Sequence, residues 1–149
     1  MRIPAILLLL SGMLRAADPF VGTWELDITK SRIDNPQVLK QVEMTFAERD
    51  NGLAWEDVQY GADGSILKRS QLILFDGMEH PDPRHPGGKY VARRLDATTF
   101  DRGTRVNGKV IGIAIDALMP DGKTLLQFVH AFNPDGSLRG DETQIWHRR

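Results

Sequence analysis

The 149-residue sequence contains no cysteine. This absence excludes disulfide bonds, thiolate metal sites, a cysteine nucleophile and the lipid-modified cysteine of a bacterial lipoprotein. A chain of this length has room for one domain, which buries about 70% of its unfolded surface and needs no covalent staple. The stability of the folded part must therefore come from its core.

The sequence also has almost no excess of charge of either sign. Its 19 Lys and Arg residues stand against 20 Asp and Glu residues, which gives a net charge of −1. Basic residues form no run interleaved with aromatics, so the sequence lacks the positive surface that neutralises phosphate groups. Nucleic acid is therefore not an expected partner.

The N-terminus carries the one long apolar run. Arg2 precedes the apolar residues 3–10, and the small residues Ala16 and Ala17 follow. This layout is typical of a secretory signal peptide, and the run is too short for a permanent membrane span, which needs about 20 residues. We therefore predict a cleaved signal peptide at residues 1–17, one domain at residues 18–149, and a periplasmic or secreted location.

Motifs of common catalytic chemistries are absent as well. The sequence has no Walker or dinucleotide-binding loop, and no serine lies in a Gly-x-Ser-x-Gly motif. Asp141 and Glu142 would point to opposite faces of a strand, which prevents shared acid–base work. The sequence thus predicts no enzyme and no cofactor.

One segment gathers residues that could bind a metal ion. His80, Asp82 and His85 lie within six positions, in a run that also holds Pro81, Pro83 and Pro86. Their spacing fits no standard zinc motif, and a fourth ligand is not visible nearby. The interpretation that we prefer is a solvated loop at a rim, without a metal.

Turn signals occur at short intervals after Asp18. They are Asp50-Asn51-Gly52, Ala62-Asp63-Gly64, Asp76-Gly77, Asn107-Gly108, Pro120-Asp121-Gly122 and Asn133-Pro134-Asp135-Gly136. Such dipeptides and tripeptides form tight hairpin turns. The β-rich runs between them predict strands near residues 21–27, 38–48, 53–60, 65–75, 89–95, 99–106, 109–119, 123–132 and 138–147.

No window shows helical periodicity, so consecutive strands should pair with each other. Closing such a meander removes its exposed edges. The predicted fold class is all-β, an antiparallel up-and-down meander β-barrel of about 8–10 strands. Residues 28–37 and 78–88 break the rhythm and should be loops at the rims, where binding residues are often found.

Hairpin centres at Asn51-Gly52 and Ala62-Asp63-Gly64 fix which residues share a face. The predicted inner face holds Val42, Met44, Phe46, Leu53, Trp55, Asp57, Gln59, Leu67, Arg69, Gln71, Ile73 and Phe75. Asp57 should lie opposite Arg69, and Trp55 opposite Gln71. Because buried charge is costly unless paired, Asp57 and Arg69 should meet. Asp57, Arg69 and Gln71 are polar contacts for a ligand, with Trp55 beside them, or else Asp57 and Arg69 form an internal structural ion pair, or a pair that faces solvent if the register is different.

The later strands carry apolar residues on both faces. The first predicted set is Ile111, Ile113, Ile115, Leu125, Val129 and Ile145, and the second is Leu126, Phe128, His130, Phe132 and Trp146. One set should line the barrel, and loops or a partner such as a second copy in a homo-oligomer should cover the other. His130 is a ligand contact if its face is inward, and a packed core histidine otherwise.

The start of the domain resembles a known group of proteins. Asp18-Pro19-Phe20-Val21-Gly22-Thr23-Trp24-Glu25-Leu26-Asp27, with later landmarks such as Phe75-Asp76-Gly77, resembles uncharacterised exported bacterial proteins with lipocalin-like (calycin-type) or fatty-acid-binding-protein-like β-barrels. Gly22-x-Trp24 is also the general lipocalin signature. It implies that Trp24 closes one barrel end beneath an arginine of the last strand, Arg148 or Arg149. The resemblance implies no catalytic residues.

Three functions remain open at this stage. The first is a non-enzymatic exported barrel that binds a small hydrophobic or amphipathic molecule through Trp55, Asp57, Arg69 and Gln71. The second is a barrel-type isomerase or cyclase. The third is a structural or interaction protein with a filled core. The volume of the internal cavity discriminates between the first and the third.

Overall fold

The computed structural model describes residues 16–149, so the predicted signal peptide lies almost wholly outside the described residues. The elements are β1 (Gly22–Leu26), η1 (Pro36–Val38), β2 (Leu39–Arg49), β3 (Gly52–Gly61), β4 (Ile66–Leu74), β5 (His80–Pro81), β6 (Gly88–Asp96), β7 (Thr99–Val106), β8 (Lys109–Leu118), β9 (Thr124–Phe132) and β10 (Leu138–Arg148). Among residues 16–149, no helix has the length and apolar content to cross a membrane.

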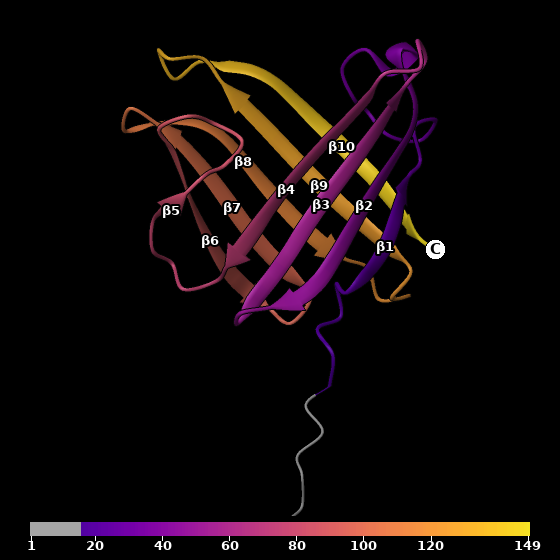
Figure 1. Ribbon diagram of the computed structural model, residues 1–149, viewed down its shortest axis with the longest axis horizontal. Coiled ribbons are helices and arrows are strands. Elements are labelled where there is room, and N and C mark those ends of the chain that lie inside the picture. Colours follow the sequence, from indigo (N-terminus) through magenta and orange to yellow (C-terminus); the bar gives the residue numbers. More distant parts are fainter. Residues whose placement is uncertain (1–15) are drawn as a thin grey trace, which may run out of the picture.

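All ten strands belong to one sheet, in the order β4-β3-β2-β1-β10-β9-β8-β7-β6-β5. Every pairing is antiparallel, and β1 joins β2 to β10, so the sheet curls around an interior (Figure 1). The predicted all-β meander is confirmed. The two-residue strand β5 was missed, because its prolines made residues 78–88 look irregular throughout.

The two ends of the sheet meet at a seam between β4 and β6. Here a side chain takes the place of backbone hydrogen bonds between strands. The hydroxyl of Tyr90 donates to the carbonyl oxygen of Leu72 at 2.6 Å and accepts from the amide of Leu74 at 3.2 Å. Tyr90 is buried. The seam is thus held by one phenol that satisfies two backbone groups of the exposed edge.

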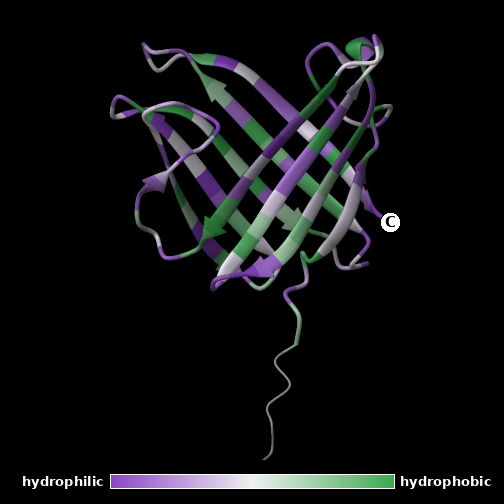
Figure 2. Cartoon of the chain, viewed as in Figure 1, coloured by the Kyte–Doolittle hydropathy of each residue, from purple (hydrophilic) through white to green (hydrophobic). Residues whose placement is uncertain are grey.

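The predicted inner face of β2, β3 and β4 is confirmed. The β2–β3 turn is centred on Asp50 and Asn51, both with positive φ, rather than on Asn51-Gly52. This shift changes each cross-strand partner by two residues, and therefore leaves every side chain on its predicted face. Alternation along these strands is visible in Figure 2. Leu67 is the exception, because it lies near the end of β4 and is 52% exposed.

The two predicted residue sets of β8, β9 and β10 are wrong, because the structure mixes them. Leu125, Val129 and Trp146 face the interior, whereas Ile113 and Ile115 face outward, opposite His130 and Phe128. In place of the outward isoleucines, β8 presents Asp116 and Ala114 to the interior. The outer face of these strands is the more apolar one.

Two local features account for this error. The β8–β9 turn pairs Met119 with Thr124, which leaves four residues in the turn where three were assumed. A β-bulge between Leu138 and Gly140 then shifts the register of β10 by one residue. Each change of one residue reverses which face a strand presents.

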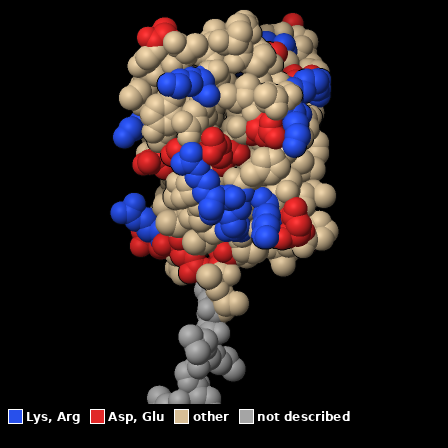
Figure 3. Space-filling model, turned by 90° about the vertical axis from the view of Figure 1, so that its right-hand side faces the viewer, with Lys and Arg blue, Asp and Glu red and all other residues tan. Residues whose placement is uncertain are grey.

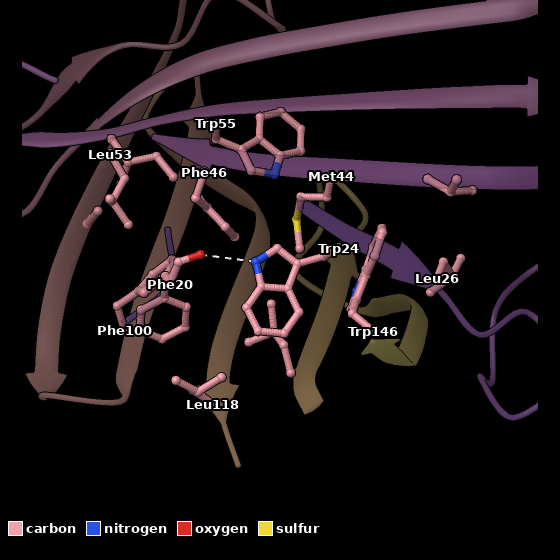
Figure 4. Packing of buried hydrophobic residues seen from close by; sticks show 14 of the residues in the cluster. Phe20, Trp24, Leu26, Met44, Phe46, Leu53, Trp55, Phe100, Leu118 and Trp146 are labelled. Carbon is pink, nitrogen blue, oxygen red and sulfur yellow. Dashed lines mark hydrogen bonds between the residues drawn. The ribbon is translucent and has the colours of Figure 1, made fainter. Parts of the chain in front are cut away.

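The end of the barrel at which β2 ends and β3 begins, the lower end in Figure 1, is filled by aromatic side chains, and we call it the closed end. The ring centroid of Phe100 lies 4.8 Å from that of Phe20 and 5.1 Å from that of Phe75, and Phe46 packs edge-on against both Phe20 and Phe100. The indole nitrogen of Trp24 donates to the carbonyl oxygen of Phe20 at 3.0 Å (Figure 4). These five residues form the aromatic plug.

Arg148 ties the plug to the chain ends. Its guanidinium carbon lies 4.2 Å from the centroid of the Trp24 ring. Its nitrogens donate to the carbonyl oxygens of Pro19, Val21 and Gly122 at 2.7, 2.6 and 2.9 Å. Of the two arginines named from the sequence, the one that stacks on Trp24 is Arg148.

The approach of Arg148 explains the glycine at position 22. Gly22 has a φ of 140°, and a Cβ atom there would lie 2.6 Å from Nη1 of Arg148. A side chain would therefore be strained by the backbone conformation and would also displace the guanidinium.

The second irregular segment is anchored by Asp82. Its buried carboxylate accepts from Nε and Nη2 of Arg84 at 3.0 and 2.8 Å and from the hydroxyl of Thr104 at 3.3 Å. Burial by itself raises the pKa of Asp82, but the hydrogen bonds from the Arg84 side chain and backbone and the Arg84 charge outweigh burial and lower that pKa to about 2. The loop is thus fixed to β7.

We predict that Arg148→Ala lowers the free energy of unfolding by about 2–3 kcal/mol, because it removes a cation–π contact and three charge-assisted hydrogen bonds. Arg149→Ala is the matched control. Arg149 pairs at the surface with Glu25 and Glu43, and its loss should cost less than about 1 kcal/mol. Urea unfolding measures both, and equal losses would contradict the role assigned to Arg148.

We predict that Asp82→Asn lowers stability at pH 7 by about 2 kcal/mol. A carboxyl whose folded pKa is depressed stabilises the fold above its unfolded pKa, and this contribution disappears as the pH falls from about 4 to about 2. Urea unfolding from pH 7 down to pH 2 should therefore show the two proteins converging in acid. A constant difference across this range would contradict the prediction.

Candidate ligand-binding cavity

A cavity of about 400 Å³ lies above the aromatic plug. Its wall is formed by Leu26, Ile33, Asp34, Asn35, Val38, Leu39, Val42, Met44, Trp55, Asp57, Gln59, Arg69, Arg84, Arg102, Ala114, Gln127, Val129, Glu142, Gln144 and Trp146. Both irregular segments contribute, through residues 33–35 and through Arg84. The prediction that these segments lie at a rim beside a cavity is confirmed.

The inner faces of β7, β8 and β9 change from apolar to polar residues just above the aromatic plug. On β7, Arg102 lies two residues after the buried Phe100. On β8, which runs in the opposite direction, Asp116 lies two residues before the buried Leu118. On β9 the buried Leu125 is followed by Gln127. Each pair is two residues apart and so lies on one face of its strand. A layer of polar groups therefore rests directly on the apolar plug.

Asp57 and Arg69 form a two-pronged ion pair on the wall. Nε and Nη2 of Arg69 donate to the carboxylate oxygens of Asp57 at 3.0 and 2.9 Å. Asp57 is buried, whereas the side chain of Arg69 is 40% exposed. The pairing predicted from the hairpin register is confirmed. Because their charges are paired, Asp57 and Arg69 form a fixed part of the cavity wall.

Arg102 and Asp116 form a looser pair at the cavity floor. Both are buried, and Nη2 of Arg102 lies 3.7 Å from Oδ2 of Asp116, beyond hydrogen-bond distance. The amide of Gln127 donates to Oδ1 of Asp116 at 2.6 Å. Burial raises the pKa of Asp116, while the Arg102 charge and the Gln127 hydrogen bond act against that rise.

Three guanidinium groups surround one indole ring. The guanidinium carbons of Arg102, Arg84 and Arg69 lie 5.2, 5.6 and 5.8 Å from the centroid of Trp55. The negative face of an aromatic ring attracts cations at such distances. Trp55 thus packs against three guanidinium groups at the inner half of the cavity, two of which are paired with Asp57 and Asp82.

Several buried polar atoms of this region have no hydrogen-bond partner among residues 16–149. They are the indole nitrogens of Trp55 and Trp146, both amide atoms of Gln71, Nε and Nη1 of Arg102, and Oδ2 of Asp116. Buried polar groups in native proteins are nearly always satisfied. Their concentration around one cavity is what a site for a polar part of a ligand requires.

Only some of the residues predicted to contact a ligand line the cavity. Trp55, Asp57 and Arg69 line the cavity together. Gln71 is buried opposite Trp55 but does not belong to the lining. His130 lies on the outer face, opposite Ile113 and Asp141, and so it is not a cavity contact.

The histidine-containing loop does not gather a metal site. Within the described part of the chain, no three histidine, aspartate or glutamate side chains converge for a metal ion. His80 lies 2.9 Å from both carboxylate oxygens of Asp76, and Asp82 is engaged by Arg84 with His85 beside it. His80 is therefore paired with Asp76, away from Asp82 and His85, whose neighbour is Arg84.

Sequence reasoning missed Arg84, Arg102, Asp116 and Gln127. Arg84 was assigned to a solvated loop. The alternation of Phe100, Arg102 and Thr104 along β7 was a signal, because it places a charge between two residues that a barrel buries. On β8 the isoleucines concealed Asp116, since an apolar set was expected to face inward.

Charged side chains of both signs pair on the outer surface. On the face shown in Figure 3, basic and acidic side chains lie beside one another. The exposed pairs include Arg149 with Glu25 and Arg93 with Asp101.

No family model matches this sequence, and no curated protein matches it. Solved structures match in fold. A Schistosoma mansoni fatty acid binding protein in complex with arachidonic acid aligns with a TM-score of 0.58 and 11% identity over 88% of this chain and 96% of that protein. The wild-type fluorescent protein UnaG aligns with a TM-score of 0.55 and 13% identity over 87% and 97% of the two chains.

A zebrafish ileal bile acid-binding protein complexed with cholic acid also matches, with a TM-score of 0.55 and 10% identity over 88% of this chain and 99% of that one. At identities of 10–13%, these similarities establish the fold alone. The chain has the β-barrel fold of the fatty-acid-binding-protein and calycin type.

Proposed function

We propose that this protein is a non-enzymatic barrel that binds a small hydrophobic or amphipathic molecule in its internal cavity. The observation that carries the proposal is the cavity itself. About 400 Å³ is lined by apolar and polar side chains in equal number, so the cavity offers contacts to both the apolar and the polar part of a small molecule. A protein whose barrel served only as a scaffold would be expected to fill this volume with side chains.

The fold neighbours support the same kind of ligand. The Schistosoma mansoni protein is in complex with arachidonic acid, and the zebrafish protein is complexed with cholic acid. Both compounds combine a large apolar body with one acidic group. These complexes give the class of molecule with which binding by this chain should first be tested.

We also propose that the barrel is exported and works in the periplasm or outside the cell. The support is the pattern of Arg2, the apolar residues 3–10 and the small residues Ala16 and Ala17. Asp18, which would follow the cleavage site, already belongs to the fold: its carboxylate pairs with Arg94 and its amide donates to Glu48 at 2.7 Å.

Ligand binding is tested by filling the cavity. Ala114 of β8 lines it, and we expect Ala114→Phe to abolish the fluorescence increase of Nile red, a neutral apolar dye, because the phenyl ring occupies the binding volume. Ala117→Phe is the matched control. Ala117 lies on the outer face of the same strand, opposite Leu126, and its variant should bind the dye like the parent.

Two results would contradict the binding proposal. One is a parent protein that binds neither the dye nor arachidonic acid. The other is equal binding by the Ala114 and Ala117 variants, since binding would then take place outside the cavity. Far-UV circular dichroism checks that both variants keep the fold.

Export is tested by the mass of the protein recovered from bacterial cells that express the full chain. We expect an envelope or culture fraction in which the first residue is Ala17 or Asp18, because signal peptidases cut after small residues. Replacing Ala16 and Ala17 by Arg should block the cut and leave a longer chain. An uncut parent chain confined to the cytoplasm would refute the export proposal.

A further inference from the structure

An apolar surface lies on the outside of the barrel, over β8, β9 and β10, which run side by side in the sheet (Figure 1). Ala114, Gln127 and Trp146 line the cavity, so the residues before and after each of them point outward. We call this surface the outer apolar face, and it is made by Ile113, Ile115, Leu126, Phe128, Phe132 and Ile145. It lies outside the cavity, so its role is independent of the proposed ligand.

The outer apolar face is continuous across the three strands. Phe128 lies between Ile115 and Thr143, and the next outward residue of β9, Leu126, lies opposite Ile145. Neighbours of this kind have Cβ atoms about 5 Å apart, so their side chains pack against one another. The face is therefore one surface rather than a set of scattered apolar residues.

The outer surface of β2, β3 and β4 has a different composition. Its outward positions hold Glu43, Thr45, Glu56, Lys68 and Ser70. An antiparallel sheet with one face in water normally alternates in this way, with apolar residues inside and polar residues outside. On β8, β9 and β10 apolar residues also point outward, and contiguous exposed apolar patches mark surfaces that contact a partner.

Charges at the border of the outer apolar face are balanced. Asp141, at one corner, accepts from both terminal nitrogens of Arg32 at 2.9 Å. Asp101, which lies opposite Ile115, accepts from Nη2 of Arg93 at 2.7 Å. A surface that binds anionic lipids carries a surplus of basic side chains around its apolar part. A balanced border instead fits an uncharged apolar surface, such as the same face of a second copy.

One end of the face carries both a projection and a depression. The projection is Leu138 of β10, which lies opposite Phe132 and is 56% exposed. The depression is a groove of about 530 Å³ between β8 and the β9–β10 turn, with Val110, Ile113 and Phe132 in its wall. The projection belongs to β10 and the groove to β8, so the two lie on either side of β9.

A two-fold axis parallel to β9 brings the projection and the groove together. Rotation about this axis places β10 of one copy over β8 of the other and keeps the ends of the strands at the same level. Leu138 of each copy then lies over the groove of the other copy. The two Phe128 side chains meet at the axis, in the centre of the contact.

The size of the face allows a dimer of moderate strength. Strands about 4.8 Å apart, over a length of about seven residues at about 3.3 Å each, give roughly 300 Å² of sheet per copy. With the relief of the side chains, two copies would bury on the order of 1,000 Å² in total, which is the lower limit of specific interfaces. The dissociation constant expected for such an interface is in the micromolar range.

We propose that the outer apolar face is the interface of a homodimer, in which two copies pack sheet against sheet about a two-fold axis parallel to β9. Sheets that pack face to face lie about 10 Å apart, with strand directions within about 30° of each other. Side chains such as those of Phe128 and Ile115 interdigitate at that spacing. The strands under the face are already paired with each other, so the contact buries no open backbone edge.

Sedimentation equilibrium of the purified protein tests the dimer. The parent should pass from monomer to dimer between about 1 and about 200 μM. Phe128→Ser should weaken the dimer about 30-fold, because it removes the central ring, and Leu138→Asp should weaken it about tenfold. Leu95→Asp is the matched control. Leu95 is 55% exposed on β6, away from the face, and its variant should dimerise like the parent.

The absence of cysteine makes the position of the axis testable as well. One introduced thiol can react only with the same residue of another copy. His130→Cys places a thiol on β9 beside Phe128, at the axis, so a short bismaleimide should join two copies in high yield. Glu56→Cys, on the outer face of β3, is the matched control and should stay uncoupled.

Three outcomes would overturn the proposal. The first is a parent that stays monomeric at about 200 μM. The second is a dimer that Phe128→Ser and Leu138→Asp leave intact, or that Glu56→Cys couples as well as His130→Cys does, because the copies would then meet elsewhere. The third is a monomeric parent that binds phosphatidylcholine–phosphatidylglycerol vesicles through Phe128, which would assign the face to a lipid surface. Far-UV circular dichroism checks each variant, and the sedimentation of the parent decides the matter even if one variant does not fold.

Discussion

The aromatic plug at the closed end is the constraint on which the rest of the structure depends. Phe20, Trp24, Phe46 and Phe100 fill the barrel there, and Arg148 fastens Trp24 to the carbonyl groups of Pro19 and Val21 and of Gly122 in the β8–β9 turn. Because the plug supplies the hydrophobic core, the strands above it are free to carry polar residues inward. The cavity exists since the core occupies only one end of the barrel.

The layer above the plug is where stability and function oppose each other. Arg102, Asp116 and Gln71 are buried with unsatisfied atoms, and an apolar layer at the same level would pack without that cost. Natural sequences break such local rules mainly at functional sites. The unsatisfied groups surround Trp55 and the cavity rather than being scattered through the fold, which supports binding by this layer.

The fold and half of the site could be predicted from the turn residues and from the alternation of apolar and polar residues along the strands. Turn residues predicted the meander, and the Asp57–Arg69 pair emerged because the turn predicted at Ala62-Asp63-Gly64 has the length that the structure shows. Arg102 and Asp116 did not follow, because a four-residue turn at Met119 to Thr124 and a bulge near Gly140 each reverse a face. A sequence shows where a turn lies more readily than how many residues it contains.

The account predicts that a ligand occupies the cavity and leaves the aromatic plug unchanged. The three tryptophans of the chain report on both regions, because Trp55 and Trp146 line the cavity and Trp24 belongs to the plug. Nitrogen NMR of the indole groups during addition of arachidonic acid separates the two regions. The signals of Trp55 and Trp146 should shift on binding, whereas that of Trp24, which donates to the carbonyl oxygen of Phe20, should stay in place. An equal shift of Trp24, or no shift of any indole signal, would contradict the account.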